Sequence, residues 1–355
     1  MMNAPLSTPP LLRTPSQARP EHPEHPEGQA AIRSRVADLY APIAAPMRSV
    51  EAMLRQQLQS EHLEIDEVLR HGTQLGGKRL RPALTLLAGA AVGQIAEAHI
   101  IVGTVVEMVH TATLIHDDVL DHAENRRHVP TVNARWNNDV SILLGDYLFA
   151  QAYRLAATLP TTIAAREIGE AARRVCEGEL HQILRRGHSR VSQETYIDMI
   201  RGKTAELLAV ACRLGAQYAG GDEATVEALG EYGQCLGVTF QIADDYLDLW
   251  GNDAEVGKTL GTDVEQGKWT LPLIRHRAVC DPDDRLQLDR AMQLPPAERL
   301  RIVRGLLERS DCRSFTKRVA QEYCERAVRV AESLPDSEAS RTLVAIARFS
   351  LRRHF

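Results

Sequence analysis

The chain has few aromatic residues, no excess of basic charge and no closely spaced cysteine pair. Aromatic residues make up only 5% of its 355 residues, whereas 44% are hydrophobic and 25% are charged. This composition is typical of a helical globular protein. The formal net charge of −5 argues against a general nucleic-acid binder, because such proteins usually carry a basic excess. An anionic ligand would therefore have to meet a local cluster of cations.

Cysteine spacing and hydrophobic run length argue against two further classes of protein. Residues 83–108 form the most apolar stretch, but Gln94, Glu97 and His99 interrupt it, so it leaves no clean window of about 20 residues for a membrane span. Scattered thiols fit a reducing compartment better than a zinc site or a disulfide framework. We therefore expect a cytoplasmic protein. The cysteines are Cys176, Cys212, Cys235, Cys280, Cys312 and Cys324.

The sequence divides into a short N-terminal tail and one long helical region. Residues 1–30 are rich in proline and histidine, a composition that cannot supply a packed core, and we expect them to be disordered. An organellar transit peptide stays open as a second interpretation, because residues 1–20 contain Arg13 and Arg19 but no acid. From residue 31 to residue 355, apolar residues recur at helical spacing without a linker. This predicts a single all-α domain, a bundle of roughly a dozen helices.

Two acidic motifs stand on apolar helical backgrounds, DDVLD at residues 117–121 and DDYLD at residues 244–248. A lone acidic cluster is usually a solvated helix face. On an apolar helix, however, two carboxylates about 6 Å apart would repel by roughly 3 kcal/mol at an effective dielectric near 20. The recurrence favours cation binding, and hard carboxylate oxygens suit Mg²⁺, which shares its coordination shell with phosphate oxygens. The candidate ligands are Asp117, Asp118, Asp121, Asp244, Asp245 and Asp248.

Positive charge gathers near predicted turns along the chain. Three cations follow a glycine pair at residues 76–77, where the start of a helix would also favour an anion. Single lysines usually only solvate a surface, so each position is weak evidence alone. The candidate anion-binding residues are Lys78, Arg79, Arg81, Arg126, Arg127, Lys203, Thr204, Lys258 and Lys268.

Taken in order, these motifs resemble the polyprenyl synthetase family of trans-prenyltransferases, over nearly all of residues 40–350. The resemblance implies an isoprenoid synthase fold around a central active-site cavity, and a long-chain enzyme such as an octaprenyl or solanesyl diphosphate synthase. The loop at residues 127–133 departs from the family pattern. The matching motifs are GGKRLRP at 76–82, DDVLD at 117–121 with Arg126-Arg127, Gly178-Glu179-Leu180, Gly202-Lys203-Thr204, FQIADDYLD at 240–248, Gly257-Lys258, Gly267-Lys268 and Thr270-Leu271-Pro272.

The resemblance also implies roles for individual residues. The six aspartates would bind magnesium, expected as three ions, together with an allylic diphosphate, and Lys203 and Lys258 would act with them in catalysis. The rest of the allylic clamp would comprise Arg126, Lys203, Thr204, Gln241, Lys258 and Lys268. Isopentenyl diphosphate would lie against Lys78, Arg79, Arg81, His110 and Arg127.

The reaction implied is a head-to-tail condensation. Positive charge stabilises the departing diphosphate so that the allylic C–O bond ionises in a site closed to water. The double bond of isopentenyl diphosphate attacks the allyl cation, and loss of a proton restores an allylic product with E geometry. An apolar cavity would protect the cation and house the growing chain.

Product length in this family depends on the residues one turn before the first acidic motif. These are Ala112 and Thr113, with no aromatic block, and Thr113 and Val106 share the face of Asp117 on the predicted helix. The absence of a block predicts a hexaprenyl to decaprenyl product, with Met108 or Phe149 as candidate floor residues. A short-chain synthase making a farnesyl or geranylgeranyl product is the alternative.

The motifs argue against three other classes of protein. A non-catalytic subunit of a heteromeric synthase is expected to have lost a motif, and here both acidic motifs are intact. A class I terpene cyclase would not keep the GGKRLRP motif, and a helical scaffold would not need two linked acidic motifs. The resemblance further implies a homodimer that delivers a long, apolar product to a membrane.

Overall fold

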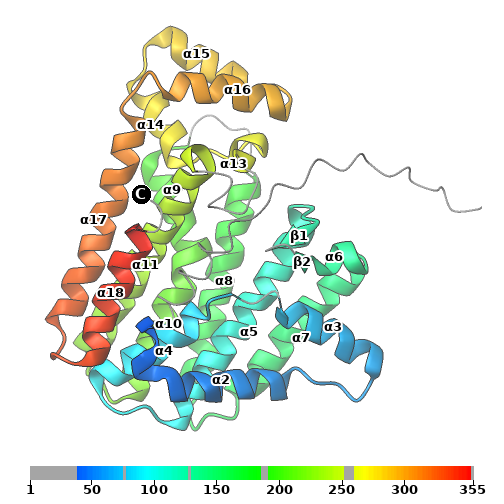
Figure 1. Ribbon diagram of the computed structural model, residues 1–355, viewed down its shortest axis with the longest axis vertical. Coiled ribbons are helices and arrows are strands. Elements are labelled where there is room, and N and C mark those ends of the chain that lie inside the picture. The colour runs from blue at the N-terminus through cyan, green and yellow to red at the C-terminus, as the bar shows by residue number, and fades with distance from the viewer. Residues whose placement is uncertain (1–37, 75–76, 127–128, 185–190, 252–259, 353–355) are drawn as a thin grey trace, which may run out of the picture.

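The chain folds into a bundle of α-helices (Figure 1), which confirms the predicted all-α class. The computed structural model describes residues 38–74, 77–126, 129–184, 191–251 and 260–352. The predicted tail lies outside them. The helices are η1 (Ala41–Ile43), α2 (Ala44–Gln57), α3 (Leu63–Gln74), α4 (Leu80–Val92), α5 (Glu97–Leu120), α6 (Val132–Arg135), α7 (Asn138–Ala156), α8 (Ile163–Leu184), α9 (Gln193–Ile200), η2 (Arg201–Ala205), α10 (Glu206–Tyr218), α11 (Glu223–Trp250), α13 (Thr262–Glu265), α14 (Leu271–Val279), α15 (Pro282–Ala291), α16 (Pro296–Leu307), α17 (Cys312–Ser333) and α18 (Glu338–Arg352).

One short hairpin follows α5, although the sequence predicted an all-α domain. Its strands, β1 (Asn125–Arg126) and β2 (Val129–Pro130), are antiparallel, with Asn125 opposite Pro130 and Arg126 opposite Val129. Two residues per strand are too few to produce the alternating pattern by which a strand is recognised in a sequence. The hairpin matters because it carries Arg126 back towards the first acidic motif.

Helix α5 is a core element of the bundle and packs most extensively against α7, with further contacts to α4, α2 and α10. Its length and composition alone would suffice for a membrane span, but 67% of its apolar window is buried inside the protein. The helix begins within the apolar stretch at residues 83–108 and continues beyond it to Leu120. Its apolar character is explained by neighbouring helices on several sides.

Two hydrophobic clusters make up the core. The larger cluster joins α2, α4, α5, α7, α8 and α10, whereas the smaller one joins α9 and α14 to α16. Helices α11 and α17 contribute to both, and Tyr323 and Leu351 pack against both, so the clusters are continuous. Tyr232 of α11 is fully buried and donates a 2.8 Å hydrogen bond to the carbonyl oxygen of Leu343 on α18.

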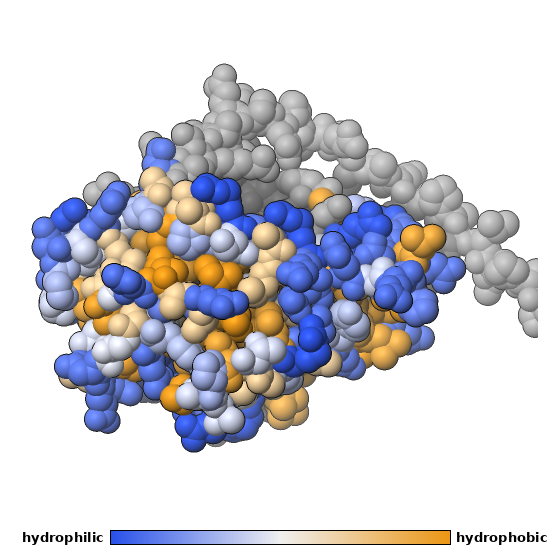
Figure 2. All heavy atoms as spheres, turned by 90° about the horizontal axis from the view of Figure 1, so that it is seen from below, coloured by the Kyte–Doolittle hydropathy of each residue, from blue (hydrophilic) through white to orange (hydrophobic). Residues whose placement is uncertain are grey.

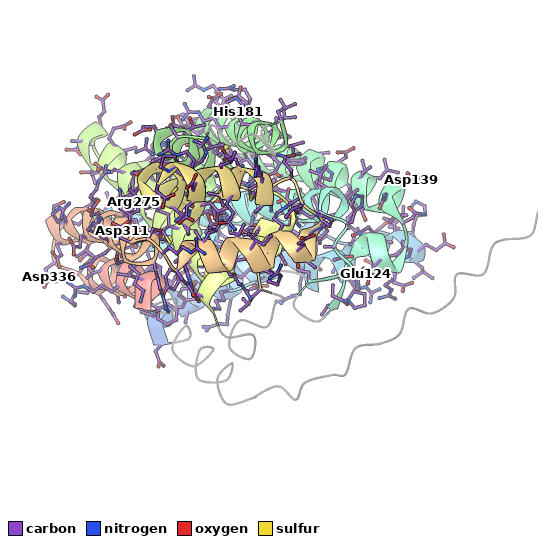
Figure 3. All side chains as sticks on the ribbon, turned by 90° about the horizontal axis from the view of Figure 1, so that it is seen from above. Glu124, Asp139, His181, Arg275, Asp311 and Asp336 are labelled. Carbon is purple, nitrogen blue, oxygen red and sulfur yellow. The ribbon has the colours of Figure 1, made fainter. Side chains whose placement is uncertain are left out.

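The two ends of the bundle differ in what covers them. Seen from above, α15 and α16 lie across one end, where Arg275 of α14 pairs with Asp311 at 2.7 Å (Figure 3). The opposite end, where α2 lies in Figure 1, has hydrophilic side chains around its rim and apolar ones towards the middle (Figure 2).

Candidate active site

The first acidic motif lies at the C-terminal end of α5. Asp117 and Asp118 are in its last turn and Asp121 is the C-cap residue. Asp118 is 2% exposed, and Arg126 of β1 binds it through two guanidinium nitrogens, Nε at 2.9 Å and Nη2 at 2.8 Å from Oδ1. Burial raises the pKa of Asp118, and the Arg126 guanidinium opposes the shift. The structure thus pairs Arg126, predicted to contact the substrate, with an aspartate of the motif.

Asp117 faces helix α8 and the segment η2. Burial raises its pKa to about 6; the nearby Lys203 opposes this shift, whereas Glu179 and Asp121 add to it. Lys203 forms an ion pair with Glu179 and donates a 2.9 Å hydrogen bond to Gln182. The end of α5 therefore presents a half-buried carboxylate to a lysine that comes from a distant part of the chain.

The second acidic motif lies in the last turns of α11, and its aspartates occupy different environments. Asp245 is 4% exposed; it accepts a 2.6 Å hydrogen bond from the Tyr196 hydroxyl and a 2.9 Å bond from Nε2 of Gln241. Burial and the neighbouring Asp263 raise the pKa of Asp245 to about 8. Asp244 precedes it on the partly exposed side of the helix.

Asp248 is hydrogen-bonded to the segment that follows α11. Its carboxylate accepts hydrogen bonds from the backbone N–H groups of Thr262 and Asp263, both at 3.1 Å, and from the Thr262 hydroxyl at 2.9 Å. Burial, followed by the charge of Asp263, raises the pKa of Asp248. Asp263 in turn pairs with Lys268 at 3.2 Å. Asp248 thereby holds the Lys268 segment beside the acidic end of α11.

Lys203 and Thr204 lie in η2, a π-helical turn between α9 and α10. Such turns are rare and occur often at functional sites. A Cβ atom at Gly178 of α8 would lie 2.7 Å from the backbone nitrogen of Lys203, so only glycine permits this approach. The Thr204 hydroxyl donates a 2.7 Å hydrogen bond to Oε1 of Gln241. In this arrangement Thr204 is engaged with α11, although the sequence predicted that it contacts the substrate.

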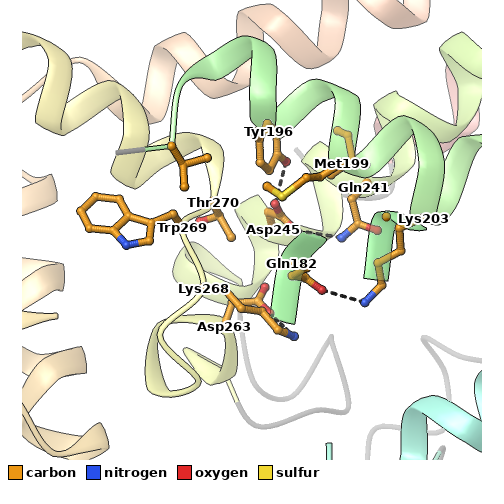
Figure 4. Close-up of a pocket in the computed structure, with 13 residues that line it drawn as sticks. Gln182, Tyr196, Met199, Lys203, Gln241, Asp245, Asp263, Lys268, Trp269 and Thr270 are labelled. Atoms are coloured by element: carbon orange, nitrogen blue, oxygen red, sulfur yellow. Dashed lines mark hydrogen bonds and ion pairs between the residues drawn. The ribbon is translucent and has the colours of Figure 1, made fainter. Parts of the chain in front are cut away.

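A cavity of about 70 Å³ lies between these elements (Figure 4). It brings together predicted residues from η2, α11 and the segment before α14, which are far apart in the sequence. Its polar lining comprises Gln182, Tyr196, Lys203, Gln241, Asp245, Asp263, Lys268 and Thr270.

The two arginines of the cation-rich loop before α4 lie in different environments. Arg79 adopts a left-handed backbone conformation with φ of 52°, and its guanidinium bonds Glu51 at 2.8 Å and Glu107 at 2.9 Å. Burial lowers the pKa of Arg81 to about 10 against the opposing charge of Glu107, and no group in the described ranges accepts a hydrogen bond from its buried Nε. Lys78 is exposed and His110 is half-buried on α5. Arg81 therefore fits an anion better than Arg79 does.

Two predicted residues, Arg127 and Lys258, lie outside the described residues. Conversely, Tyr196 and Asp263 lie in the site but were not predicted from the sequence. Neither belongs to a recognisable motif. Tyr196 lies seven residues before Lys203, and Asp263 lies five residues before Lys268. This closeness to motif residues is the sequence signal that could have pointed to them.

The donor set fits magnesium bound together with a ligand. Among the described residues, no three acidic, histidine or cysteine side chains are grouped so that they could hold a metal by themselves. The available donors are carboxylate oxygens, and burial raises the pKa values of Asp117 and Asp245, so a bound cation would favour their ionised forms. Mg²⁺ prefers one or two carboxylates plus phosphate oxygens and water.

Comparisons with known proteins agree with this geometry. A profile of the polyprenyl synthetase family matches residues 62–307. The all-trans-nonaprenyl-diphosphate synthase (geranyl-diphosphate specific) of Rhodobacter capsulatus is 33% identical over 317 residues, 89% of this chain and 97% of the relative. Heptaprenyl diphosphate synthase component 2 of Bacillus subtilis is 34% identical over 306 residues, 86% of this chain and 87% of the relative.

A solved structure extends the similarity to three dimensions. The polyprenyl synthase of Caulobacter crescentus, complexed with calcium and isoprenyl diphosphate, superimposes with a TM-score of 0.84 at 34% identity, covering 90% of this chain and 98% of the other. With the matching profile and relatives above 30% identity, the chain belongs to the polyprenyl synthetase family and is a prenyltransferase.

Proposed function

We propose that the chain is a long-chain trans-polyprenyl diphosphate synthase, which adds isopentenyl diphosphate units to an allylic diphosphate primer with magnesium. The observation that carries this proposal is the placement of Lys203. It lies near Asp117 at the end of α5, and it lines the same cavity as Asp245 at the end of α11. A diphosphate between the two acidic ends would meet a cation directly.

Within each acidic motif, some aspartates would bind magnesium and others would position the end of the helix. Asp117, Asp121 and Asp244 would offer oxygens to magnesium, whose charge would stabilise the leaving diphosphate. Asp118, Asp245 and Asp248 have both carboxylate oxygens engaged by protein donors, so they would orient the helix ends. The family resemblance, in contrast, implied that all six aspartates bind magnesium.

The chain's own cations would complete the allylic diphosphate site. Lys203 and Lys268 would donate hydrogen bonds to its oxygens, and Gln241 would use the second N–H of its amide, since the first already binds Asp245. From the family resemblance, Lys258 would also bind the allylic diphosphate. As the allylic C–O bond ionises, these donors would stabilise the charge that develops on the departing oxygen.

The second substrate would lie on the loop before α4. Arg81 has a buried donor that an isopentenyl diphosphate oxygen could satisfy, and Lys78, His110 and Arg127 would surround it. Arg79 would instead position the loop through its bonds to Glu51 and Glu107. Burying a guanidinium without an acceptor is costly, so Arg81 gains most from a bound anion.

The side chains along α5 support a long product. Ala112 is fully buried and offers only a methyl group one turn before the first motif, and Thr113 beside it is also small. Met108 is fully buried and Phe149 half-buried, as candidate floor residues would be. A short-chain product would need a bulky block at this level of the helix.

Helix α7 offers a surface for a second subunit. Four large hydrophobic residues of α7 are substantially exposed on the isolated chain: Ile142, Leu143, Tyr147 and Tyr153. A homodimer would bury them. The similarity to a protein named component 2 of a heptaprenyl diphosphate synthase favours, as the alternative, a catalytic chain that needs a different partner.

Incubation of the purified full chain with Mg²⁺, farnesyl diphosphate and labelled isopentenyl diphosphate tests the proposal. Chromatography of the dephosphorylated products should show a ladder that ends at one long chain and disappears with EDTA or in Asp117→Ala. No elongation with any shorter primer would contradict a self-sufficient synthase. Elongation that appears only after a second protein is added would favour the heteromeric alternative.

A further inference from the structure

A buried tyrosine outside the sequence motifs contacts the second acidic motif. Tyr196 lies on α9 and is 2% exposed, and its hydroxyl donates to Oδ2 of Asp245 at 2.6 Å (Figure 4). A hydrogen bond to an ionised carboxylate is stronger than one between neutral groups, and it matters most where water is absent. Tyr196 is therefore a principal restraint on this carboxylate.

The bond is one end of a chain of hydrogen bonds with fixed directions. Gln241 donates from Nε2 to Oδ1 of Asp245 at 2.9 Å and accepts at Oε1 from the Thr204 hydroxyl at 2.7 Å. A carboxylate only accepts, so the amide of Gln241 must turn its nitrogen towards Asp245 and its oxygen towards Thr204. The chain connects α9, α11 and η2.

We infer that Tyr196 is a positioning residue of the site, one that fixes the rotation of α11 and so the direction in which Asp244 presents its oxygens; this inference rests on the proposed function. Gln241, Asp244 and Asp248 are all partly exposed and follow one another at three- and four-residue spacing, so they share one side of the helix. Asp245 is buried behind that side, where Tyr196 holds it.

Loss of the hydroxyl would act on the site through Asp245. In the magnesium-bound site, where the ionised form is favoured, Asp245 would carry its charge in a buried position with one donor fewer, which is costly. It would turn towards another donor or draw in water, and α11 would turn with it. The oxygens of Asp244 would then move relative to Lys203, and the magnesium and diphosphate that both must hold would bind more weakly.

Tyr196→Phe tests the inference, because it removes a single oxygen. Tyr232→Phe is the matched control: its hydroxyl is equally buried and bonds the carbonyl oxygen of Leu343 at 2.8 Å, but its residue lies in the larger core cluster. Titration calorimetry of the full chain with inorganic diphosphate, with and without Mg²⁺, measures binding without turnover. The magnesium concentration for half-maximal elongation is measured in parallel.

We expect both variants to lose similar thermal stability, but only Tyr196→Phe to weaken magnesium-dependent diphosphate binding, by about tenfold. Thr204→Val, at the other end of the hydrogen-bond chain, should weaken it in the same direction. If the wild type binds diphosphate and both site variants bind it like Tyr232→Phe, the inference is overturned and the proposed function stands. A wild-type chain that bound no diphosphate with Mg²⁺ would overturn both.

Discussion

Gly178 of α8 lies so close to Lys203 of η2 that a Cβ atom at residue 178 would be 2.7 Å from the backbone nitrogen of Lys203 and 3.1 Å from the carbonyl oxygen of Met199. Both neighbours are backbone atoms, so they cannot turn aside as a flexible side chain would. The contact lets α8 bring Glu179 to the side chain of Lys203. This gives a physical reason for the Gly-Glu pair that the sequence showed only as a motif.

Gly178→Ala should therefore displace η2 and Lys203. We expect the free energy of unfolding to fall by about 2 kcal/mol, as for other overpacked sites, and elongation to fall more steeply than stability alone explains. Gly305→Ala on α16 is the control, because nothing lies within 4 Å of the added methyl group. Chemical denaturation and product assays compare the two. Equal behaviour of the variants would contradict the close-contact argument.

The pair formed by Asp118 and Arg126 should show non-additive energetics. Arg126→Gln leaves a buried carboxylate without its partner, and we expect a loss of about 2 kcal/mol in the free energy of unfolding. Asp118→Asn in the same chain should recover part of this loss, because the uncompensated charge is gone. Arg348→Gln, whose pair with Glu332 is exposed, should change little. Denaturant titration of the single and double variants measures the coupling, and additive losses would show that the pair is not coupled.

The raised pKa values predict a pH dependence in the chain without metal. Burial raises the pKa of Asp117 to about 6 and that of Asp245 to about 8, above the ordinary value of 3.8. The folded state then binds more protons than the unfolded state. The contribution of these two groups to the free energy of unfolding is therefore complete below pH 3.8, and it is lost as pH rises through about 6 and about 8.

Magnesium with diphosphate should oppose this loss, because both favour ionised carboxylates. Melting temperatures measured from about pH 5 to about pH 9 in EDTA should fall as pH rises, and the slope should flatten with Mg²⁺ and inorganic diphosphate. Asp245→Asn should remove the upper part of the slope. If that variant kept the full slope in EDTA, the assignment to Asp245 would be wrong.

The sequence identified the chemistry of the site better than its geometry. Helical periodicity gave the all-α class, and the DDxxD motifs and Lys203 lie around the site as expected. The π-helical turn was not predictable, because it depends on the close approach of Gly178 across helices. Arg79 was grouped with the substrate cations, but its left-handed backbone directs its side chain to Glu51 and Glu107. Tyr196 belongs to no sequence motif, and its role depends on a contact with a residue 49 positions away.

Product length offers the last test, at the fully buried Ala112. If the growing chain extends along α5 past this methyl group, Ala112→Phe should stop elongation early and give a shorter main product. Overpacking will also cost about 1–3 kcal/mol of stability, so Ala327→Phe on α17, equally buried, is the control. Chromatography of the dephosphorylated ladder should show shortening in the first variant only. Unchanged length in Ala112→Phe would place the product chain elsewhere in the bundle, whereas shortening in both variants would point to general destabilisation.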